Sequence, residues 1–489
     1  MIETDLAELI EKVRTMKAES QTLELKAARQ GCPKKLYDTL SAFSNQDMGG
    51  ILLFGIDEES GFEVVGVYDV QDLQKKVNEQ CKQMVPVVRP VFTAVHLSEG
   101  SVLAAEIPGI DITERPCYYG GVGRMKGSYV RAGDSDEPMS DYEIYSYEAY
   151  RKKYQDDVRI NERAELSAID MGKMSAYVEQ IKEDNPRLGS LPRKDIERFL
   201  NMVIDERPTL ACTLLFSVYP QMFYPQYTVN AMVVPGYERG EAAEDGARFL
   251  DNKRIEGTLL DMLENTMKFL KKNMRVRTVI DRETGKRTDI PEYPPVALRE
   301  AVLNSLVHRD YSIHTEAMPV EVIMYKDRLE IRNPGGLYGR LTLDKLGKMQ
   351  PDTRNPVLAR AMETLGITEN RYSGIPTIQR ELRLAGMREA EFSDSRNEFS
   401  VTFYNREEQQ EPFRTDMAIL SDGEVQGIIE FCRTPRSRNE IAQYLRIKTI
   451  YYMMSHYVNP LLEAGQLKMT LPDKPKSKNQ RYYSGAPEE

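Results

Sequence analysis

The stretch "SAFSNQDMGGILLFGID", residues 41–57, joins the end of a helix to the start of a strand. Gly49 and Gly50 end the helix and permit a tight turn. The apolar run that follows predicts a strand buried on both faces. Upstream, residues 4–17 carry apolar side chains at helical spacing. These patterns predict that residues 1–150 form an α/β domain.

The entrance to the preceding predicted strand, "AESQTLELKAA" at residues 18–28, is unusually charged. Leucines alternate with Glu24 and Lys26, as in a half-buried strand with one polar face. Glu19 precedes this strand by a few residues. Alternation alone explains Glu24 and Lys26 as a surface ion pair worth about 0 to 1 kcal/mol. A chemical role for these charges needs further support.

The chain of 489 residues is too long for a single core and should form several domains. It is 41% hydrophobic and 29% charged, and no apolar run approaches the roughly 20 residues of a membrane span. Its five scattered cysteines suggest neither a disulfide framework nor a zinc site. We therefore expect a cytoplasmic protein with no membrane partner.

Composition shifts divide the chain into five predicted segments. They are an α/β domain (1–150), a helical bridge (151–205), a second α/β unit (206–404), a polar linker (405–416) and a small basic module (417–489). Within the second unit the pattern predicts helices over 248–273 and 295–308 and a long helical stretch over 355–385. The predicted fold class is thus α/β multidomain.

The motif "VALREAVLNSLVHRDYS", residues 296–312, places Glu300 and Asn304 four apart on one helix face, with His308 one turn further on. This spacing is similar to that in the ATPase fold of gyrase, histidine kinases and heat-shock chaperones, also called the GHKL or Bergerat fold. The resemblance implies that Glu300 activates water and Asn304 binds Mg²⁺ in one nucleotide cleft.

Together with "LEIRNPGGL" (329–337) and "SGIPTIQREL" (373–382), this motif resembles the C-terminal domain of RecG-like proteins. That domain has the ATPase fold but no helicase motor. The resemblance implies ATP as a cofactor and leaves open a weak ATPase activity. The residues that it implies for cofactor binding are Asn304, His308, Asn333, Gly335, Gly336, Ser373 and Gly374. Two departures weaken the case for hydrolysis: Asn333 replaces an adenine-binding aspartate, and the later glycine box is reduced to "SGIP".

The N-terminal motifs "ESQTLELK", "SAFSNQDMGGILLFGID" and "YVRAGDSDEPM" resemble the AlbA-type, or Schlafen AlbA_2, nucleic-acid-binding domain. Some Schlafen relatives are metal-dependent RNases. The resemblance implies that Glu19 and Glu24 hold Mg²⁺ or Mn²⁺ with Asp57 or Glu58, and that Lys26 stabilises the transition state. The alternative is a non-catalytic binding surface, along which basic residues such as Arg131 would follow a phosphate backbone.

The C-terminal module combines three short predicted helices with a basic hairpin. Between residues 433 and 481, ten lysines and arginines face three acidic residues, a local formal charge of +7 on a chain whose net charge is −10. This arrangement predicts a winged helix-turn-helix that binds nucleic acid. The candidate contact residues are Arg436, Arg438, Lys448, Thr449, Tyr452, Lys474, Lys476, Lys478 and Arg481. The alternative is a protein-protein or dimerisation module.

The order of the three domains resembles a family of bacterial transcriptional regulators. The leading hypothesis is a homo-oligomeric regulator that binds nucleic acid, with DNA the first expectation and RNA the second, and that senses ATP. The second hypothesis is a Schlafen-like RNase used in phage defence. The third is an oligomeric scaffold without catalysis.

Overall fold

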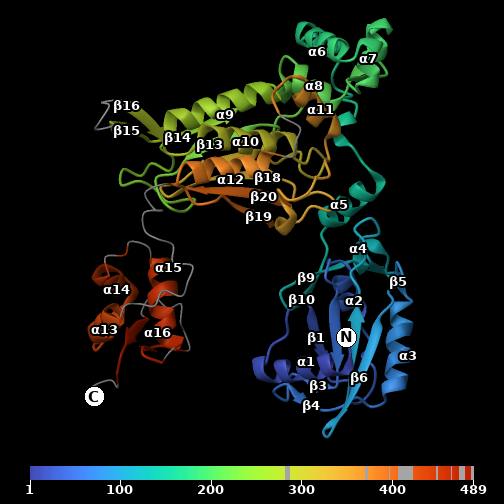
Figure 1. Ribbon diagram of the computed structural model, residues 1–489, viewed down its shortest axis with the longest axis vertical. Coiled ribbons are helices and arrows are strands. Elements are labelled where there is room, and N and C mark those ends of the chain that lie inside the picture. Colours follow the sequence, from blue (N-terminus) through green and yellow to red (C-terminus); the bar gives the residue numbers. More distant parts are fainter. Residues whose placement is uncertain are drawn as a thin grey trace. The chain divides into compact units, whose positions relative to one another are not determined.

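The computed structural model describes residues 1–280, 287–368, 373–395, 397–405, 422–445, 447, 450–463, 465–472 and 480–485. The chain divides into two compact units, Met1–Glu408 and Gln409–Glu489. Both units contain helices and sheets, and the two large sheets of the first unit are mixed, so the predicted α/β multidomain class is confirmed (Figure 1). None of the helices in the described ranges is long and apolar enough to cross a membrane.

The N-terminal sheet has four strands in the order β1-β2-β7-β6. In that order they span Leu23–Lys26, Gly50–Phe54, Gly100–Ile107 and Val91–Leu97. β1 and β2 are parallel, and the other neighbours are antiparallel. Helix α1 (Glu3–Met16) packs on one face, while α2 (Tyr37–Ser44) and α3 (Val70–Cys81) cover the other (Figure 1).

Strand β2 contributes to both cores of this domain, as its apolar run predicts. Leu52 and Phe54 pack under α2 and α3, and Leu53 packs under α1. The turn into β2 requires Gly49, whose φ is +63° and whose Cβ would lie 2.1 Å from a backbone oxygen of β7. The neighbouring strand β7 therefore leaves room only for glycine at the turn between α2 and β2.

Asn45, at the end of α2, is part of the domain's framework. Its amide nitrogen donates to the carbonyl oxygens of Cys117 and Tyr129, at 2.9 and 3.1 Å, and its Oδ1 accepts from the Cys117 N–H at 2.6 Å. A buried amide with this many partners holds the end of α2 against the segments around Cys117 and Tyr129.

The remaining elements of this domain are short. They are β3 (Ile56–Asp57), β4 (Glu63–Val64), β5 (Met84–Val85), β8 (Tyr118–Tyr119), α4 (Arg124–Gly127), β9 (Tyr129–Ala132) and β10 (Ser135–Pro138). β9 and β10 form an antiparallel hairpin that contacts α2. Helix α5 (Asp141–Lys152) follows, and the main helices after it are α6 (Met171–Asp184), α7 (Arg193–Phe199) and α8 (Leu210–Phe216).

The elements between Val229 and Tyr404 form a second α/β body within the Met1–Glu408 unit. This body contains a six-stranded sheet in the order β14-β13-β17-β18-β20-β19. In that order the strands span Asp251–Ile255, Val229–Val233, Val320–Met324, Arg328–Pro334, Glu398–Tyr404 and Glu391–Ser395. Helices α9 (Leu259–Asn273), α10 (Pro295–Val307) and α12 (Gly374–Leu384) share one large core with this sheet. Helix α11 (Pro356–Thr364) joins that core, and β15 (Val276–Ile280) pairs with β16 (Arg287–Pro291) as a separate hairpin.

Two predicted helices are shorter than their apolar pattern suggests. Residues 251–255 of the predicted helix 248–273 form β14, and α9 begins only after Thr258, which caps it in a capping box with Asp261. The predicted stretch 355–385 contains two helices, α11 and α12. The N-cap at Thr258 sets the start of α9, and Gly366, with a φ of +68°, follows the end of α11.

The C-terminal unit contains α13 (Asp422–Phe431), α14 (Arg438–Tyr444), α15 (Ile450–Met453) and α16 (Asn459–Glu463), with a π-helical turn at Met454–Val458. A three-stranded antiparallel sheet in the order β21-β23-β22 completes it. Its strands span Arg436–Ser437, Arg481–Tyr483 and Lys468–Met469. Its helices and strands are compatible with a winged helix, which remains a prediction.

Candidate functional site

A cavity of about 580 Å³ lies in the second α/β body, between the sheet, helix α10 and helix α12. Its lining includes all the residues implied for the ATPase-like site: Glu300, Asn304, His308, Asn333, Gly335, Gly336, Ser373 and Gly374. The structure therefore brings together three motifs that are separated in the sequence. Their individual roles remain predictions.

One end of the cavity is formed by α10 and the start of α12. Glu300 and Asn304 project from α10, and the Asn304 Nδ2 donates to Glu300 Oε1 at 3.3 Å. A Cβ at Gly374 would lie 2.5 Å from Glu300 Oε1 and 2.9 Å from Asn304 Nδ2. Any larger residue at position 374 would have to displace the ends of these two side chains.

The sheet forms the floor of the cavity and is mainly apolar. Ile331 and Asn333 point to the same face of β18, and their direct partners on β20 are Val401 and Phe399. Asn333 is 6% exposed, and its Oδ1 has no hydrogen-bond partner within the described part of the chain.

The cavity wall after β18 depends on a buried ion pair. Arg354 Nη1 lies 2.7 Å from Asp310 Oδ2, and Arg354 Nη2 donates to the carbonyl oxygen of Gly336 at 2.7 Å. Burial alone would raise the pKa of Asp310, but Arg354 and the hydroxyl of Tyr142 hold it below its usual value. This pair fastens the turn formed by Gly335 and Gly336 after β18, the glycine turn, to the segment that precedes α11.

Helix α5 supports the same wall through two tyrosine hydroxyls. Tyr142 donates to Asp310 Oδ2 at 2.6 Å, and Tyr150 donates to Asp352 Oδ2 at 3.1 Å. Asp352 and Arg354 both line the cavity. The segment between the glycine turn and α11 is thus held near its end by side chains from α5.

His308 caps the C-terminal end of α10 and faces the cavity. The surrounding protein atoms and the positive charge of Arg354 together lower the pKa of its imidazole below the usual value of 6.5, although the residue is exposed to the cavity space. The imidazole is therefore neutral at pH 7, and a neutral ring can donate one hydrogen bond and accept another.

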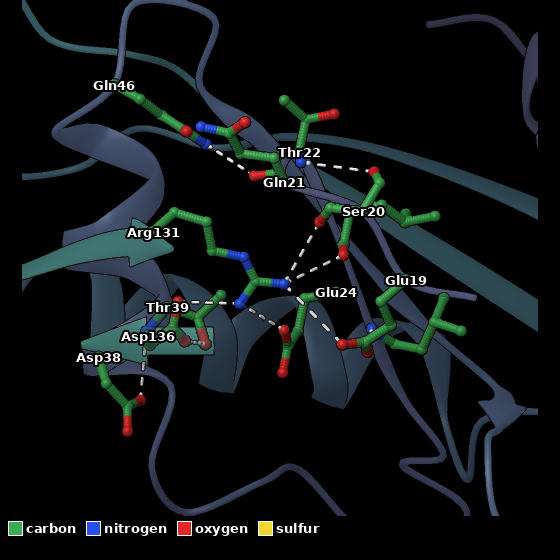
Figure 2. A network of polar contacts seen from close by, with 12 residues as sticks. Glu19, Ser20, Gln21, Thr22, Glu24, Asp38, Thr39, Gln46, Arg131 and Asp136 are labelled. Atoms are coloured by element: carbon green, nitrogen blue, oxygen red, sulfur yellow. Dashed lines mark hydrogen bonds and ion pairs between the residues drawn. The ribbon is translucent and has the colours of Figure 1, made fainter. Parts of the chain in front are cut away.

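A second polar cluster lies in the N-terminal domain around the guanidinium of Arg131. Figure 2 shows this group between Glu24, Asp136 and Glu19. Arg131 Nη1 lies 2.8 Å from Glu24 Oε2 and 2.9 Å from Asp136 Oδ1, and Nη2 lies 3.8 Å from Glu19 Oε2. Its side chain is 1% exposed, so Arg131 cannot follow a phosphate backbone as the sequence suggested.

The same guanidinium also satisfies backbone groups at the entrance to β1. Arg131 Nη2 donates to the carbonyl oxygens of Ser20 and Leu23 at 3.4 and 3.3 Å (Figure 2). Asp136 in turn accepts from Thr39 Oγ1 of α2 at 2.6 Å. Arg131 therefore connects the β9–β10 hairpin, β1 and α2.

The carboxylates implied for metal binding have other partners. Glu24 pairs with both Arg131 and Lys26, and Glu19 Oε1 accepts from the Leu25 N–H at 2.6 Å. Asp57 accepts from the Glu59 N–H at 3.3 Å in the turn between β3 and β4, and Glu58 is exposed. No group of three or more metal-ligating side chains occurs among the described residues. The described residues therefore do not gather the implied ligands into one such group, and metal binding by Glu19, Glu24 and Asp57 or Glu58 remains a prediction.

Three of the predicted nucleic-acid contacts lie in the described part of the C-terminal unit. Arg436 donates to the Phe431 carbonyl at 3.3 Å, Arg438 donates to the Tyr482 hydroxyl at 3.0 Å, and Arg481 donates to the Pro435 carbonyl at 3.1 Å. Lys448, Thr449, Lys474, Lys476 and Lys478 lie outside the described residues, as does the side chain of Tyr452. The three arginines thus help to hold the unit together.

Sequence reasoning did not identify Asp310 and Arg354 as parts of the site. Both occur in polar segments that read as loop, and no local spacing marks them as partners. The run "HRDYS" after the α10 motif placed Asp310 near the site, but only the folded chain shows its contact with Arg354.

Comparisons with known families match three separate parts of the chain. Residues 19–140 match the family described as "Schlafen, AlbA_2", and residues 317–403 match "Putative ATP-dependent DNA helicase recG C-terminal". Residues 423–483 match "Filamentation induced by cAMP protein Fic-like, C-terminal domain". The first two matches confirm the predicted AlbA_2 and ATPase-like domains. The second begins after α10, so Glu300 and Asn304 lie outside it.

Two solved structures are similar to the chain. The DIP2311 protein from Corynebacterium diphtheriae is 18% identical with a TM-score of 0.39, and the alignment covers 98% of this chain and 96% of that chain. The N-terminal domain of a RecG-related protein from Nitrosomonas europaea is 27% identical with a TM-score of 0.22, covering 27% of this chain and 92% of that one. The search of curated proteins found no match.

The Arg131 cluster makes a prediction about pH. Burial, with smaller contributions from the negative charges of Glu24 and Glu58, raises the pKa of Glu19 from 4.5 to about 7. The folded state therefore binds a proton more tightly than the unfolded chain, so stability should fall as the pH rises from about 4.5 to about 7. Glu19→Gln removes the titrating group, so over this pH range we expect the free energy of unfolding of the variant to fall by about 1 to 2 kcal/mol less than that of the wild type. This value is smaller than the full pKa shift would give, because the carboxyl is only partly enclosed.

Urea unfolding of the full chain at a series of pH values measures this effect. The matched control is Glu59→Gln, which neutralises an exposed carboxylate nearby and should leave the pH dependence as in the wild type. Parallel stability curves for the wild type and Glu19→Gln would contradict the assignment of a raised pKa to Glu19.

Proposed function

We propose that this chain is a nucleic-acid-binding regulator whose ATPase-like domain binds a purine nucleotide in the cavity between α10, α12 and β18. The observation that carries the proposal is the convergence of Glu300, Asn304, Asn333 and Gly374 on one cavity. Its volume of about 580 Å³ lies within the range of about 300 to 1,000 Å³ typical of small-molecule sites.

The two ends of the cavity suit the two ends of a nucleotide. The floor around Asn333 offers apolar side chains to a flat base and a side-chain amide to its polar edge. The other end offers the start of α12, where the helix dipole favours phosphate. Gly374 supports this assignment because it leaves backbone, and no side chain, beside Glu300 and Asn304.

Glu300 and Asn304 would hold a divalent cation at the phosphate end. A carboxylate and an amide carbonyl are oxygen ligands of the kind that Mg²⁺ accepts, and Mg²⁺ completes its shell with phosphate oxygens and water. When bound, the cation would offset phosphate charge. Glu300 is also placed to orient water, so nucleotide turnover should be assayed together with binding.

Nucleic-acid binding is the second part of the proposal. It is supported by the AlbA_2 match over residues 19–140, by the RecG-related description of residues 317–403, and by the basic charge of the C-terminal module. A local excess of lysine and arginine attracts phosphate even on an acidic protein. We further propose that the protein forms homo-oligomers and that it acts in the regulation of transcription.

The nuclease hypothesis is less well supported by the geometry. Glu24 is engaged by Arg131 and Lys26, and Glu19 accepts a hydrogen bond from β1. A metal at this position would have to compete with a buried guanidinium for the same carboxylate. We therefore assign Glu24 a structural role and base the proposal on the cavity.

The nucleotide proposal predicts ligand stabilisation. At a concentration of ATP·Mg²⁺ one hundred times its Kd, binding to the native state stabilises it by about 2.7 kcal/mol. We expect the melting temperature of the full chain to rise by several degrees, and Asn304→Ala to remove most of this rise because it deletes a cation ligand. Asn252→Ala, at an exposed position of the same sheet, is the matched control. A wild type whose melting temperature is unchanged at millimolar ATP·Mg²⁺ contradicts the proposal.

The nucleic-acid proposal predicts a salt-dependent contribution from the C-terminal module. Substituting Lys474, Lys476 and Lys478 with alanine should weaken DNA binding and reduce the slope of log K against log salt by about 2 to 3. Substituting Lys268, Lys271 and Lys272 of α9 makes the same change in net charge and should leave the slope unchanged. Equal slopes for the wild type and the Lys474/476/478 variant, measured by fluorescence anisotropy, would rule out this module as the DNA-binding surface.

A further inference from the structure

Asn333 is the polar group on the otherwise apolar floor of the cavity. It lies directly opposite Phe399 in the ladder between β18 and β20, and Ile331 and Val401 form the next pair on that face. The ring of Phe399 stacks on that of Phe392, with centroids 6.1 Å apart and planes inclined by 19°. This floor is suited to a flat ring rather than to a flexible chain.

Among the described residues that line the cavity, Asn333 alone carries a buried side-chain atom without a hydrogen-bond partner. An unsatisfied buried acceptor costs about 1 to 3 kcal/mol, so natural proteins rarely keep one without a use. Because Oδ1 is buried, a ligand reaches it only when the amide turns over toward the cavity, and an N–H donor placed there then removes this cost. A planar heterocycle with a polar edge meets both requirements of the floor.

The charged side chains near the glycine turn are bonded to other protein groups and do not bind the edge of the ring. The Asp310 carboxylate is engaged by Arg354 at 2.7 Å and by Tyr142 at 2.6 Å, and the second Arg354 amino group is bonded to Gly336. Asn333 is therefore the side chain on the floor that can read the edge of the ring.

A side-chain amide and a carboxylate read that edge differently. An ionised aspartate only accepts hydrogen bonds, whereas an asparagine presents an acceptor and a donor on one planar group that can turn over. In one orientation Oδ1 accepts from a 6-amino group, as in adenine. In the other, Nδ2 donates to a 6-oxo group, as in guanine or hypoxanthine.

We infer that Asn333 is a specificity-determining residue that allows the cavity to bind 6-amino and 6-oxo purine nucleotides with similar affinity. This inference rests on the proposed purine nucleotide site and deepens it by assigning the residue that sets its selectivity for the base. An aspartate at position 333 would reject the 6-oxo group, because a buried carboxylate and a carbonyl oxygen would meet without a proton between them.

Isothermal titration of the full chain with ATP and GTP, each with Mg²⁺ at pH 8, tests the inference. We expect the wild-type Kd values for ATP and GTP to agree within tenfold. Asn333→Asp should increase the ratio of the GTP Kd to the ATP Kd by at least tenfold. Asn252→Asp, which adds the same charge at an exposed position of β14, should leave the ratio as in the wild type.

A second variant keeps the test decisive if Asn333→Asp does not fold. Asn333→Leu removes both hydrogen-bonding groups, so it should weaken ATP and GTP by similar factors of about tenfold or more. Unchanged affinities in this variant would overturn the role of Asn333.

The possible failures separate the two proposals. A wild type that binds ATP at least tenfold more tightly than GTP overturns the inference but leaves the nucleotide site intact. An unchanged ratio in folded Asn333→Asp also overturns it. A wild type that binds neither nucleotide rejects the site and the inference together.

Discussion

The buried ion pair between Asp310 and Arg354 is the contact on which the cavity wall depends. It joins the end of the α10 segment to the segment before α11, and Arg354 also holds the backbone of the glycine turn through Gly336. Removing one member of such a pair leaves an uncompensated charge and commonly costs about 3 to 5 kcal/mol. The shape of the cavity and the position of Asn333 beside that turn follow from this contact, and α5 adds to it through Tyr142.

A similar arrangement organises the N-terminal domain. Arg131 is enclosed by Glu24, Asp136 and Glu19 and connects a late hairpin to the first strand. In both bodies a buried arginine joins segments that are distant in the chain and satisfies backbone carbonyls as well as carboxylates. The two arginines differ in their surroundings, because Arg354 lines a large cavity whereas Arg131 is enclosed by its own partners. This difference is why the proposed ligand site lies in the second body.

Much of the fold could be predicted because apolar periodicity reports burial directly. The run after Gly49 became β2, buried on both faces, and the first helix formed close to its predicted bounds. The helix predicted over 248–273 failed at its start because the polar strand β14 carries no alternating apolar pattern. Glu300 and Asn304 could be found from their spacing on one helix. Arg131 could not, since its backbone partner Leu23 is 108 residues away and nothing local marks the pair.

The central claim is that the cavity beneath α10 and α12 is a purine nucleotide site. Hydrogen-deuterium exchange of the full chain with and without ATP·Mg²⁺ tests it most directly, because bound ligand protects the backbone that it contacts or orders. The account predicts slower exchange in residues 329–337 and 373–384, with little change in the N-terminal sheet. Exchange that is unchanged in both cavity segments at saturating nucleotide, or protection confined to other parts of the chain, would contradict it.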